Sequence, residues 1–389
     1  MRYRCTLIAV GLLLSAPVWA DWPMYAHDPA RTGVADGGGP SQLEVQWSVE
    51  LGGRVDSSPA VSDGVVYVGS TGGSVYAVDA ETGEIVWRQE LDGPVTSSPC
   101  VAEGRVFVGC VDTFAYALDA RTGDVAWRRR ADGPVTASPA FLDGVTYWAS
   151  TAGRVFALRA ADGDEVWRHD LGARVAASPC VGSGALYIGD LGGALRALRL
   201  VDGAPVWQYD AWGPPGGPKD RLLATAALVG SVVFVGSQDM WHGEPKPPAP
   251  DPDLHLQAVD AATGEARWTL KAPGSVMGSP AVGGGIVYAA GNEGYPSSRA
   301  AVYAVDAASG AKRWRWPEKG SGAGVVHTAP AIAGDMVYFA DLDGTVYIFS
   351  AQKGAPVALH ATGGPVYSSP AISDGRLFVG SGDGKLYCF

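Results

Sequence analysis

The sequence predicts an all-β protein, an eight-bladed β-propeller whose blades are four-stranded antiparallel sheets. Three observations predict it: an eleven-residue motif recurs along the chain, a short strand marked by proline recurs in step with it, and the chain ends carry complementary strands. Four of the motif's tryptophans, Trp87, Trp127, Trp167 and Trp207, are 40 residues apart. A constant period of this length is the signature of a repeat architecture.

The motif first occurs at residues 77–87, which read Ala-x-Asp-x-x-Thr-Gly-Glu-x-x-Trp. In its turn, Asp79 is expected to accept hydrogen bonds from the backbone and Gly83 to take a positive φ. Other copies lie at 117–127, 157–167, 197–207, 258–268 and 304–314, and a last one at 348–358 keeps Gly354 but has Ala358 in place of the tryptophan.

The tryptophans hold a fixed place in the predicted fourth strand of each unit. Because a buried indole contributes a large apolar area, they are expected to dock one blade on the next rather than to form a row that stacks on sugars. The predicted blade-docking residues are Trp47, Trp87, Trp127, Trp167, Trp207, Trp268, Trp314, Gly83, Gly123 and Gly264.

Each unit is predicted to be a meander of four strands, A to D. In the first full copy the strands are expected at 57–61, 65–69, 75–78 and 85–88, with turns at Asp63-Gly64 and Gly72-Gly73. Asp-Gly between alternating apolar runs is a strong hairpin signal.

Counting the units gives eight. The tryptophan position and the strand-A position each occur eight times, the latter at Pro59, Pro99, Pro139, Pro179, Ala226, Pro280, Pro330 and Pro370. The chain begins with a lone D strand at 45–49 and ends with a C strand at 385–389. A closed ring explains this, because the first strand completes the last blade and leaves only short, protected edges.

The first residues are predicted to direct export. Arg2 and Arg4 precede an apolar run at 6–14, and Val18-Trp19-Ala20 is a typical cleavage site. The expected domains are therefore a signal peptide at 1–20, an N-terminal extension at 21–40 and the propeller at 41–389. We expect a periplasmic or secreted protein with no lipid-attachment cysteine at the cleavage point and no transmembrane segment after cleavage.

The charge of the exported chain argues against a nucleic-acid partner. Removing residues 1–20 takes away two of the 29 basic residues and none of the 40 acidic ones, which leaves a net charge of −13. Nucleic-acid binding requires a basic surface. We expect a monomer with a protein partner instead.

Neither cysteine spacing nor the acidic turns predict a metal site. Cys100, Cys110, Cys180 and Cys388 form no Cys-x-x-Cys pair and are expected to be small buried residues. The run Asp341-Leu342-Asp343-Gly344 is interpreted as a B–C turn, because calcium needs six or more oxygen ligands.

The repeated Ala-x-Asp-x-x-x-Gly-x-x-x-Trp motif resembles the tryptophan-docking motif of the PQQ-like β-propeller repeat family, and the resemblance covers about residues 41–389. The opening run from Asp21 to Asp28 is also similar to the start of many exported members. The resemblance implies one of two activities: a quinoprotein dehydrogenase with pyrroloquinoline quinone (PQQ) and calcium, or a non-enzymatic scaffold similar to the outer-membrane assembly component BamB.

The scaffold is the favoured interpretation of this resemblance. Quinoprotein dehydrogenases typically have a vicinal Cys-Cys pair, and this sequence has none, nor a Cys-x-x-Cys-His haem site. A cofactor needs a binding shell. We therefore predict no catalytic residues, no cofactor and no metal, and keep a PQQ- and calcium-dependent dehydrogenase and a small-ligand or glycan receptor as alternatives.

Four connections are longer than the regular spacing, and all are expected on one face. They lie around 212–219, within 237–254, near 292–299 and within 316–324, in D–A or B–C connections between blades 4 and 7 counted from the first full unit. Loop elaboration on one face of a repeat scaffold is the usual place for binding. The predicted partner-binding residues there are Trp212, Arg221, Met240, Trp241, His242, Asn292, Tyr295, Arg299, Trp316 and Lys319.

Overall fold

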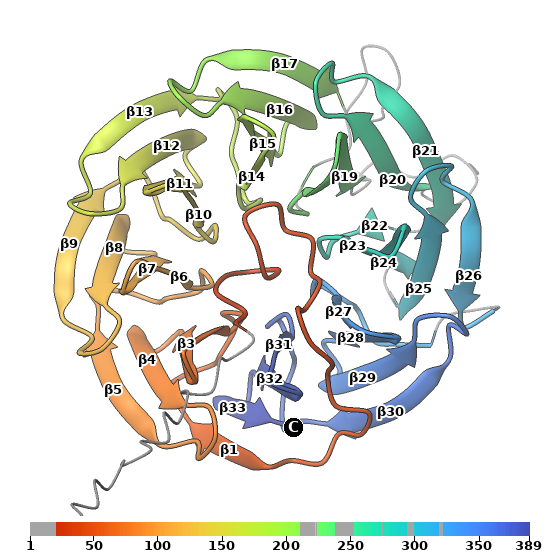
Figure 1. Cartoon of the computed structure of the whole chain (residues 1–389), viewed down its shortest axis with the longest axis horizontal. Helices are drawn as coiled ribbons and strands as arrows, with labels where there is room; N and C mark the ends of the chain where they lie inside the picture. The colour runs from red at the N-terminus through yellow and green to blue at the C-terminus, as the bar shows by residue number, and fades with distance from the viewer. Residues whose placement is uncertain are drawn as a thin grey trace, which may run out of the picture.

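The computed structural model describes residues 21–210, 222, 224–237, 253–273, 275–293, 299–318 and 322–389. In this part of the chain all regular structure is β, and eight antiparallel sheets stand side by side in a closed ring (Figure 1). The predicted all-β, eight-bladed propeller is confirmed.

Blades 1 to 4 are regular four-stranded meanders, with strand A innermost and strand D outermost (Figure 1). Their strands are β2 (Ala60–Ser62), β3 (Val65–Gly69), β4 (Ser74–Asp79) and β5 (Ile85–Glu90); β6 (Cys100–Ala102), β7 (Arg105–Gly109), β8 (Phe114–Asp119) and β9 (Val125–Arg130); β10 (Ala140–Leu142), β11 (Val145–Ala149), β12 (Arg154–Arg159) and β13 (Glu165–Asp170); β14 (Cys180–Gly182), β15 (Ala185–Gly189), β16 (Ala194–Arg199) and β17 (Pro205–Asp210).

Blades 5 to 8 keep the same order with longer strands in blades 5 and 6, and blade 6 has a fifth strand because two short strands both pair with its strand B. Their strands are β18 (Ala227–Val229), β19 (Val232–Ser237), β20 (Asp253–Asp260) and β21 (Ala266–Pro273); β22 (Ser275–Val276), β23 (Ala281–Gly283), β24 (Ile286–Glu293), β25 (Arg299–Asp306) and β26 (Lys312–Trp316); β27 (Ala331–Ala333), β28 (Met336–Ala340), β29 (Thr345–Ser350) and β30 (Pro356–Ala361); β31 (Ala371–Ser373), β32 (Arg376–Gly380), β33 (Lys385–Cys388) and β1 (Trp47–Glu50).

The ring closes through the two ends of the chain, as the sequence predicts. Strand β1 pairs antiparallel with β33, with Trp47 opposite Cys388 and Glu50 opposite Lys385. The eighth blade therefore takes its D strand from the start of the chain and its other strands from the end. This arrangement leaves only short, protected sheet edges between blades.

The motif turn has the local chemistry that its sequence indicates. The Oδ1 atom of Asp79 accepts hydrogen bonds from the amides of Glu81 and Thr82, and Gly83 has a φ of +76°. Two features exclude a side chain at Gly83. The positive φ is strained for other residues, and a Cβ atom would lie 2.7 Å from the indole of Trp47.

Seven of the eight seams between blades use the same contact. The indole of one blade's D strand lies on the motif glycine of the next blade, and its Nε1 donates a hydrogen bond to a backbone carbonyl of that blade. The donor and acceptor pairs are Trp47–Ala80, Trp87–Ala120, Trp127–Ala160, Trp167–Leu200, Trp207–Ala261, Trp268–Ala307 and Trp314–Ala351, at 2.7 to 3.2 Å.

At the eighth seam, between blades 7 and 8, the tryptophan position holds a small residue and the glycine position a large one. Ala358 takes the tryptophan position, and Leu43, four residues before Trp47, takes the place that glycine has in the other copies. Leu43 is buried in the same hydrophobic cluster against which Ala358 packs. The large and the small residue of this seam thus belong to one cluster, with their positions in the motif reversed.

A ring of hydroxyl groups joins the eight A strands. The residue before each strand-A marker accepts a hydrogen bond from the backbone amide of its neighbour in the preceding blade, as Ser98 does from Ser58 at 3.0 Å. The acceptors are Ser58, Ser98, Ser138, Ser178, Thr225, Ser279 and Ser369. Blade 7 has Ala329 at this position and supplies no hydroxyl.

The described cysteines are free and buried. Burial raises the pKa of the Cys100 thiol to about 12, so this thiol is protonated at neutral pH. Asp341 to Gly344 form the B–C turn between β28 and β29, as the sequence predicts.

We predict that Leu43 and Ala358 are energetically coupled across the reversed seam. Leu43→Gly should lower the free energy of unfolding by about 3 kcal/mol because it leaves a cavity. Ala358→Trp should also destabilise, because it overpacks the cluster. In the double variant the losses should be smaller than additive by about 1–3 kcal/mol. Urea unfolding measures all three; strict additivity would show that the two residues do not share one packing site.

Candidate functional site

The two faces of the ring are built differently. The A–B and C–D turns form one face, which we call the strap face, and the D–A and B–C connections form the other, the insertion face. Residues 21–46, the N-terminal strap, cross the middle of the ring before entering β1 (Figure 1).

The strap is hydrogen-bonded to six blades at the same register position in each. In each of these blades the amide two residues after the strand-A marker donates a hydrogen bond to a strap carbonyl. The pairs are Val61–Trp22, Val101–Pro23, Val181–Pro29, Leu228–Ala30, Val282–Thr32 and Ile332–Gly33, at 2.7 to 2.8 Å. These residues lie next to the A–B turns, and Asp21 accepts a further bond from the amide of Asp63 in such a turn. The strap therefore covers the strap face.

Arg31 also holds the strap in place, through its side chain. Its guanidinium is fully buried and donates to four carbonyl oxygens, those of Tyr25, Ser138, Pro139 and Pro179, at 2.6 to 3.2 Å. Burial lowers the pKa of Arg31, but an arginine stays charged in proteins. The carbonyl dipoles replace the water that this charge would otherwise bind.

Tyr25 contacts the hydroxyl ring beside the blade that lacks its member. Its phenol oxygen lies 2.9 Å from Oγ of Ser279 in blade 6. Ser279 is the ring member that would contact a hydroxyl at position 329, where Ala329 stands. The strap thus places a further hydroxyl group next to the gap in the ring.

The insertion face has its own inner ring of side chains that are half-buried or exposed, the residues three positions before each strand-A marker. Both neighbours of each member in the sequence are buried, as Val55 and Ser57 are beside Asp56. In the described blades the members are Asp56, Thr96, Thr136, Ala176, Met277, His327 and Tyr367. Arg54 pairs with Asp56 at 2.7 Å and lies over the ring of Tyr367.

His327 and Tyr367 bring adjacent blades together in this ring. Their side chains contact edge to face, with centroids 5.8 Å apart. Burial lowers the pKa of His327, so its imidazole is neutral at neutral pH. The ring combines one ion pair, two hydroxyls and an aromatic pair on the surface that carries the longer connections.

The predicted partner-binding residues fall in three groups. Asn292 is buried in β24 and bridges to the backbone of Val326 through both amide atoms, at 2.8 and 2.9 Å. It is a residue that joins blades 6 and 7, not the exposed loop contact that the sequence predicts. Trp316 is half-buried against Tyr347 and Phe349.

Arg299, by contrast, is exposed at the start of β25. Strands β24 and β25 pair as far as Glu293 opposite Arg299, so most of the predicted insertion in blade 6 extends a hairpin rather than a loop. The remaining predicted residues, Trp212, Arg221, Met240, Trp241, His242, Tyr295 and Lys319, lie outside the described residues.

Sequence reasoning missed the strap and the reversed seam. The strap is not part of the repeat, and its contacts are made by backbone atoms, which leave no pattern in the sequence. The available signal was Arg31, which is the only Lys or Arg in the predicted extension at 21–40. Leu43 could have been found by counting four residues back from Trp47.

Comparisons place the fold in a known family. A family model described as "Outer membrane protein assembly factor BamB" matches residues 40–140, 111–244 and 252–389, which is nearly the whole propeller. The chain belongs to this family. No curated protein sequence matches it.

Solved structures give the same architecture at low sequence identity. BamB from Moraxella catarrhalis is 20% identical, with a TM-score of 0.72, 89% of this chain covered and 99% of that chain. A quinohemoprotein alcohol dehydrogenase from Comamonas testosteroni is 15% identical, with a TM-score of 0.78 and coverage of 95% and 80%. A computationally designed protein, Ika8, is 15% identical with a TM-score of 0.71 and coverage of 90% and 99%. At these identities the matches show the fold alone.

The described residues do not fit a bound quinone. PQQ carries carboxylates that need cations, and calcium needs six or more oxygen ligands. The inner ring of the insertion face offers Arg54, which is already paired with Asp56. Within the described ranges no three His, Cys, Asp or Glu residues are grouped as metal ligands would be. We derive no chemical step through this cofactor.

Among the residues with described structure, none forms a helix of the length and apolarity needed to cross a membrane.

We predict that Arg31 anchors the strap. Arg31→Met should lower the free energy of unfolding by about 3 kcal/mol, because it leaves buried carbonyls without donors. Arg121→Met, at an exposed C–D turn, should stay within about 0.5 kcal/mol of the unmodified protein. Urea unfolding of both variants tests this; equal stability of the Arg31 variant and the control would contradict it.

Proposed function

We propose that this protein is an exported, non-catalytic scaffold that binds a protein partner through the insertion face at blades 4 to 7. The observation that carries the proposal is the asymmetry of the two faces. The strap occupies the centre of one face, and all four longer connections belong to the other. Binding on repeat scaffolds usually uses the face where connections are elaborated.

Family membership supports this role. The matched family is described as an outer membrane protein assembly factor. By analogy, a role in envelope or outer-membrane protein assembly is the most direct proposal for this chain, with a periplasmic or secreted location after cleavage behind Ala20. Fold similarity alone does not carry function, so the site must be tested directly.

The extended hairpin of blade 6 is a suitable part of such a site. Strands β24 and β25 are eight residues long, against five and six in the regular blades. Asn292 ties the hairpin to blade 7 through two buried hydrogen bonds. A hairpin that is held in place loses little conformational freedom on binding, which favours affinity.

A photo-crosslinking residue placed at Arg299 should therefore give a discrete crosslinked species with the partner in intact cells. Ala308, exposed at the C–D turn of the same blade, is the matched control on the strap face and should give none. Gel mobility with mass spectrometry reads the result. Crosslinks from Ala308 alone, or equal crosslinks from both positions, would reject the proposed face.

The dehydrogenase alternative predicts a different result. A ligand that binds only the folded state raises the melting temperature at saturating concentration. Because the described insertion-face ring lacks the required donors, PQQ with Ca²⁺ should leave the melting temperature of the purified protein unchanged, and no dye should be reduced with alcohols. A saturable rise that requires both additions would revive the enzyme.

A further inference from the structure

A cavity of about 90 Å³ lies at the seam between blades 2 and 3. It is formed between the end of β9 and strands β12 and β13. Its floor is apolar, with Ala131, Phe156 and Leu158, which are almost fully buried. Its polar wall holds four arginines and two acids: Arg129, Arg130, Arg154, Arg168, Asp132 and Glu165.

Both wall acids are already shared among arginines. Asp132 lies 3.2 Å from Arg154 and 3.4 Å from Arg168, and Glu165 lies 2.5 Å from Arg168. Neither carboxylate has an ion pair with Arg130. The two acids thus pair with Arg154 and Arg168 and not with Arg130.

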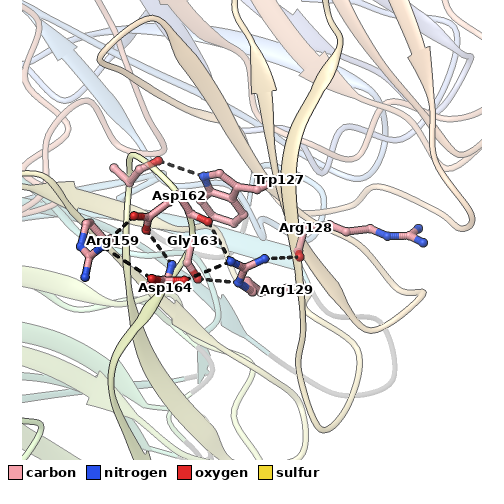
Figure 2. A network of polar contacts seen from close by, with 8 residues as sticks. Trp127, Arg128, Arg129, Arg159, Asp162, Gly163 and Asp164 are labelled. Atoms are coloured by element: carbon pink, nitrogen blue, oxygen red, sulfur yellow. Dashed lines mark hydrogen bonds and ion pairs between the residues drawn. The ribbon is translucent and has the colours of Figure 1, made fainter.

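The other arginines of the seam also have partners outside the cavity. Arg129 extends to the motif turn of blade 3, where it donates to the carbonyls of Asp162 and Gly163 and to Asp164, whereas Arg128 points away (Figure 2). Arg154 has a second partner, Asp170, at 3.4 Å. Arg130 differs from all of them: across the described ranges it forms no ion pair.

The repeat gives an internal control for this residue. Arg130 stands three positions after the docking tryptophan of its blade. The same position is acidic in four other blades, where it holds Glu50, Glu90, Asp170 and Asp210. Blade 5 has Lys271 at this position, so blade 2 is one of two blades with a basic residue where four others have a carboxylate.

A neighbouring position deviates in the same sense. Arg154 begins strand C of blade 3, at the position that holds Ser74, Phe114 and Ala194 in blades 1, 2 and 4. Two positions that are acidic or neutral in neighbouring units are both arginine here, and they line the same cavity. Like the longer connections, these residues depart from a repeat that otherwise preserves packing.

We propose that this cavity is a binding site for a compact oxyanion of the phosphate or sulfate type. Guanidinium groups bind such oxyanions through fixed, forked N–H donors. The apolar floor limits solvent access on one side, which strengthens the attraction. The volume has room for several water molecules, or for one such anion in their place.

The cavity runs along the seam: its Arg130 and Arg154 end lies toward the insertion face, and Glu165 lies at the start of a D strand, next to a C–D turn. Arg130 ends strand D and Arg154 follows a B–C turn, so both belong to the ends of strands from which the D–A and B–C connections leave. It is on the opposite side of the ring from blades 5 to 7, and it does not depend on the proposed partner site. The phosphate could come from a free ion or from an anionic lipid headgroup, since both present the same oxygens.

The first arm of the test is isothermal titration calorimetry with inorganic phosphate at constant ionic strength. Arg130→Glu, which restores the residue type found at Glu90, should weaken binding at least tenfold. Arg130→Gln removes the charge without adding a carboxylate beside Asp132 and should also weaken it. Arg121→Glu makes the same charge change at an exposed turn of the same blade and should bind as the unmodified protein does.

The second arm identifies the source. Vesicles of phosphatidylglycerol and of phosphatidylcholine are sedimented with the protein. Sedimentation with phosphatidylglycerol that is lost in Arg130→Glu assigns a lipid headgroup, and phosphate binding without sedimentation assigns a free anion. The proposal is overturned if neither probe binds, or if Arg121→Glu and Arg130→Glu weaken binding equally. A cooperative melt for every variant shows that the effects are not due to unfolding.

Discussion

The docking of a tryptophan on the glycine of the next blade is the contact on which the whole ring depends. It explains why the motif has its residues: the glycine leaves space for the indole, and Asp79 and its counterparts hold the turn that presents a carbonyl to Nε1. A buried indole contributes a large apolar area, and its polar atom is satisfied at the same time. Repetition of this contact at seven seams lets the blades vary elsewhere. The reversed pair at the eighth seam, Leu43 and Ala358, fits a requirement for complementary volume rather than for the tryptophan itself.

Much of the fold could be predicted from the sequence because the determinants are local and repeated. Strand alternation, Asp-Gly turns and the spacing of tryptophans predict the blades, and the unmatched strands at 45–49 and 385–389 predict the closure that β1 and β33 make. The site could be predicted only in part. The spacing of markers locates the longer connections, but it does not tell a loop from an extended hairpin, so Asn292 was expected on the surface and is buried. The strap left no periodic signal, because it binds the ring mainly through its backbone.

The strap makes the two faces of a repetitive ring inequivalent. Its carbonyls take up amides of six A strands, Arg31 reaches four carbonyls of the interior, and Tyr25 meets the ring of hydroxyls beside Ala329. The centre of the strap face is thereby filled by the protein's own chain. The insertion face keeps the exposed Tyr367 and the half-buried Thr96 and Thr136 in its inner ring, and it carries the longer connections. Family membership and this asymmetry together favour a scaffold that recognises its partner on one face.

Backbone amide hydrogen exchange in the free protein tests most directly whether the strap seals its face. The amides of Val61, Val101, Val181, Leu228, Val282 and Ile332 donate to the strap, whereas those of Phe141 and Ile372, at the same register position in blades 3 and 8, have no acceptor within the described residues. Exchange is slow where opening requires cooperative unfolding. The account predicts slow exchange for the six amides and much faster exchange for the other two. Fast exchange at all eight positions would show that the strap does not cover its face in solution.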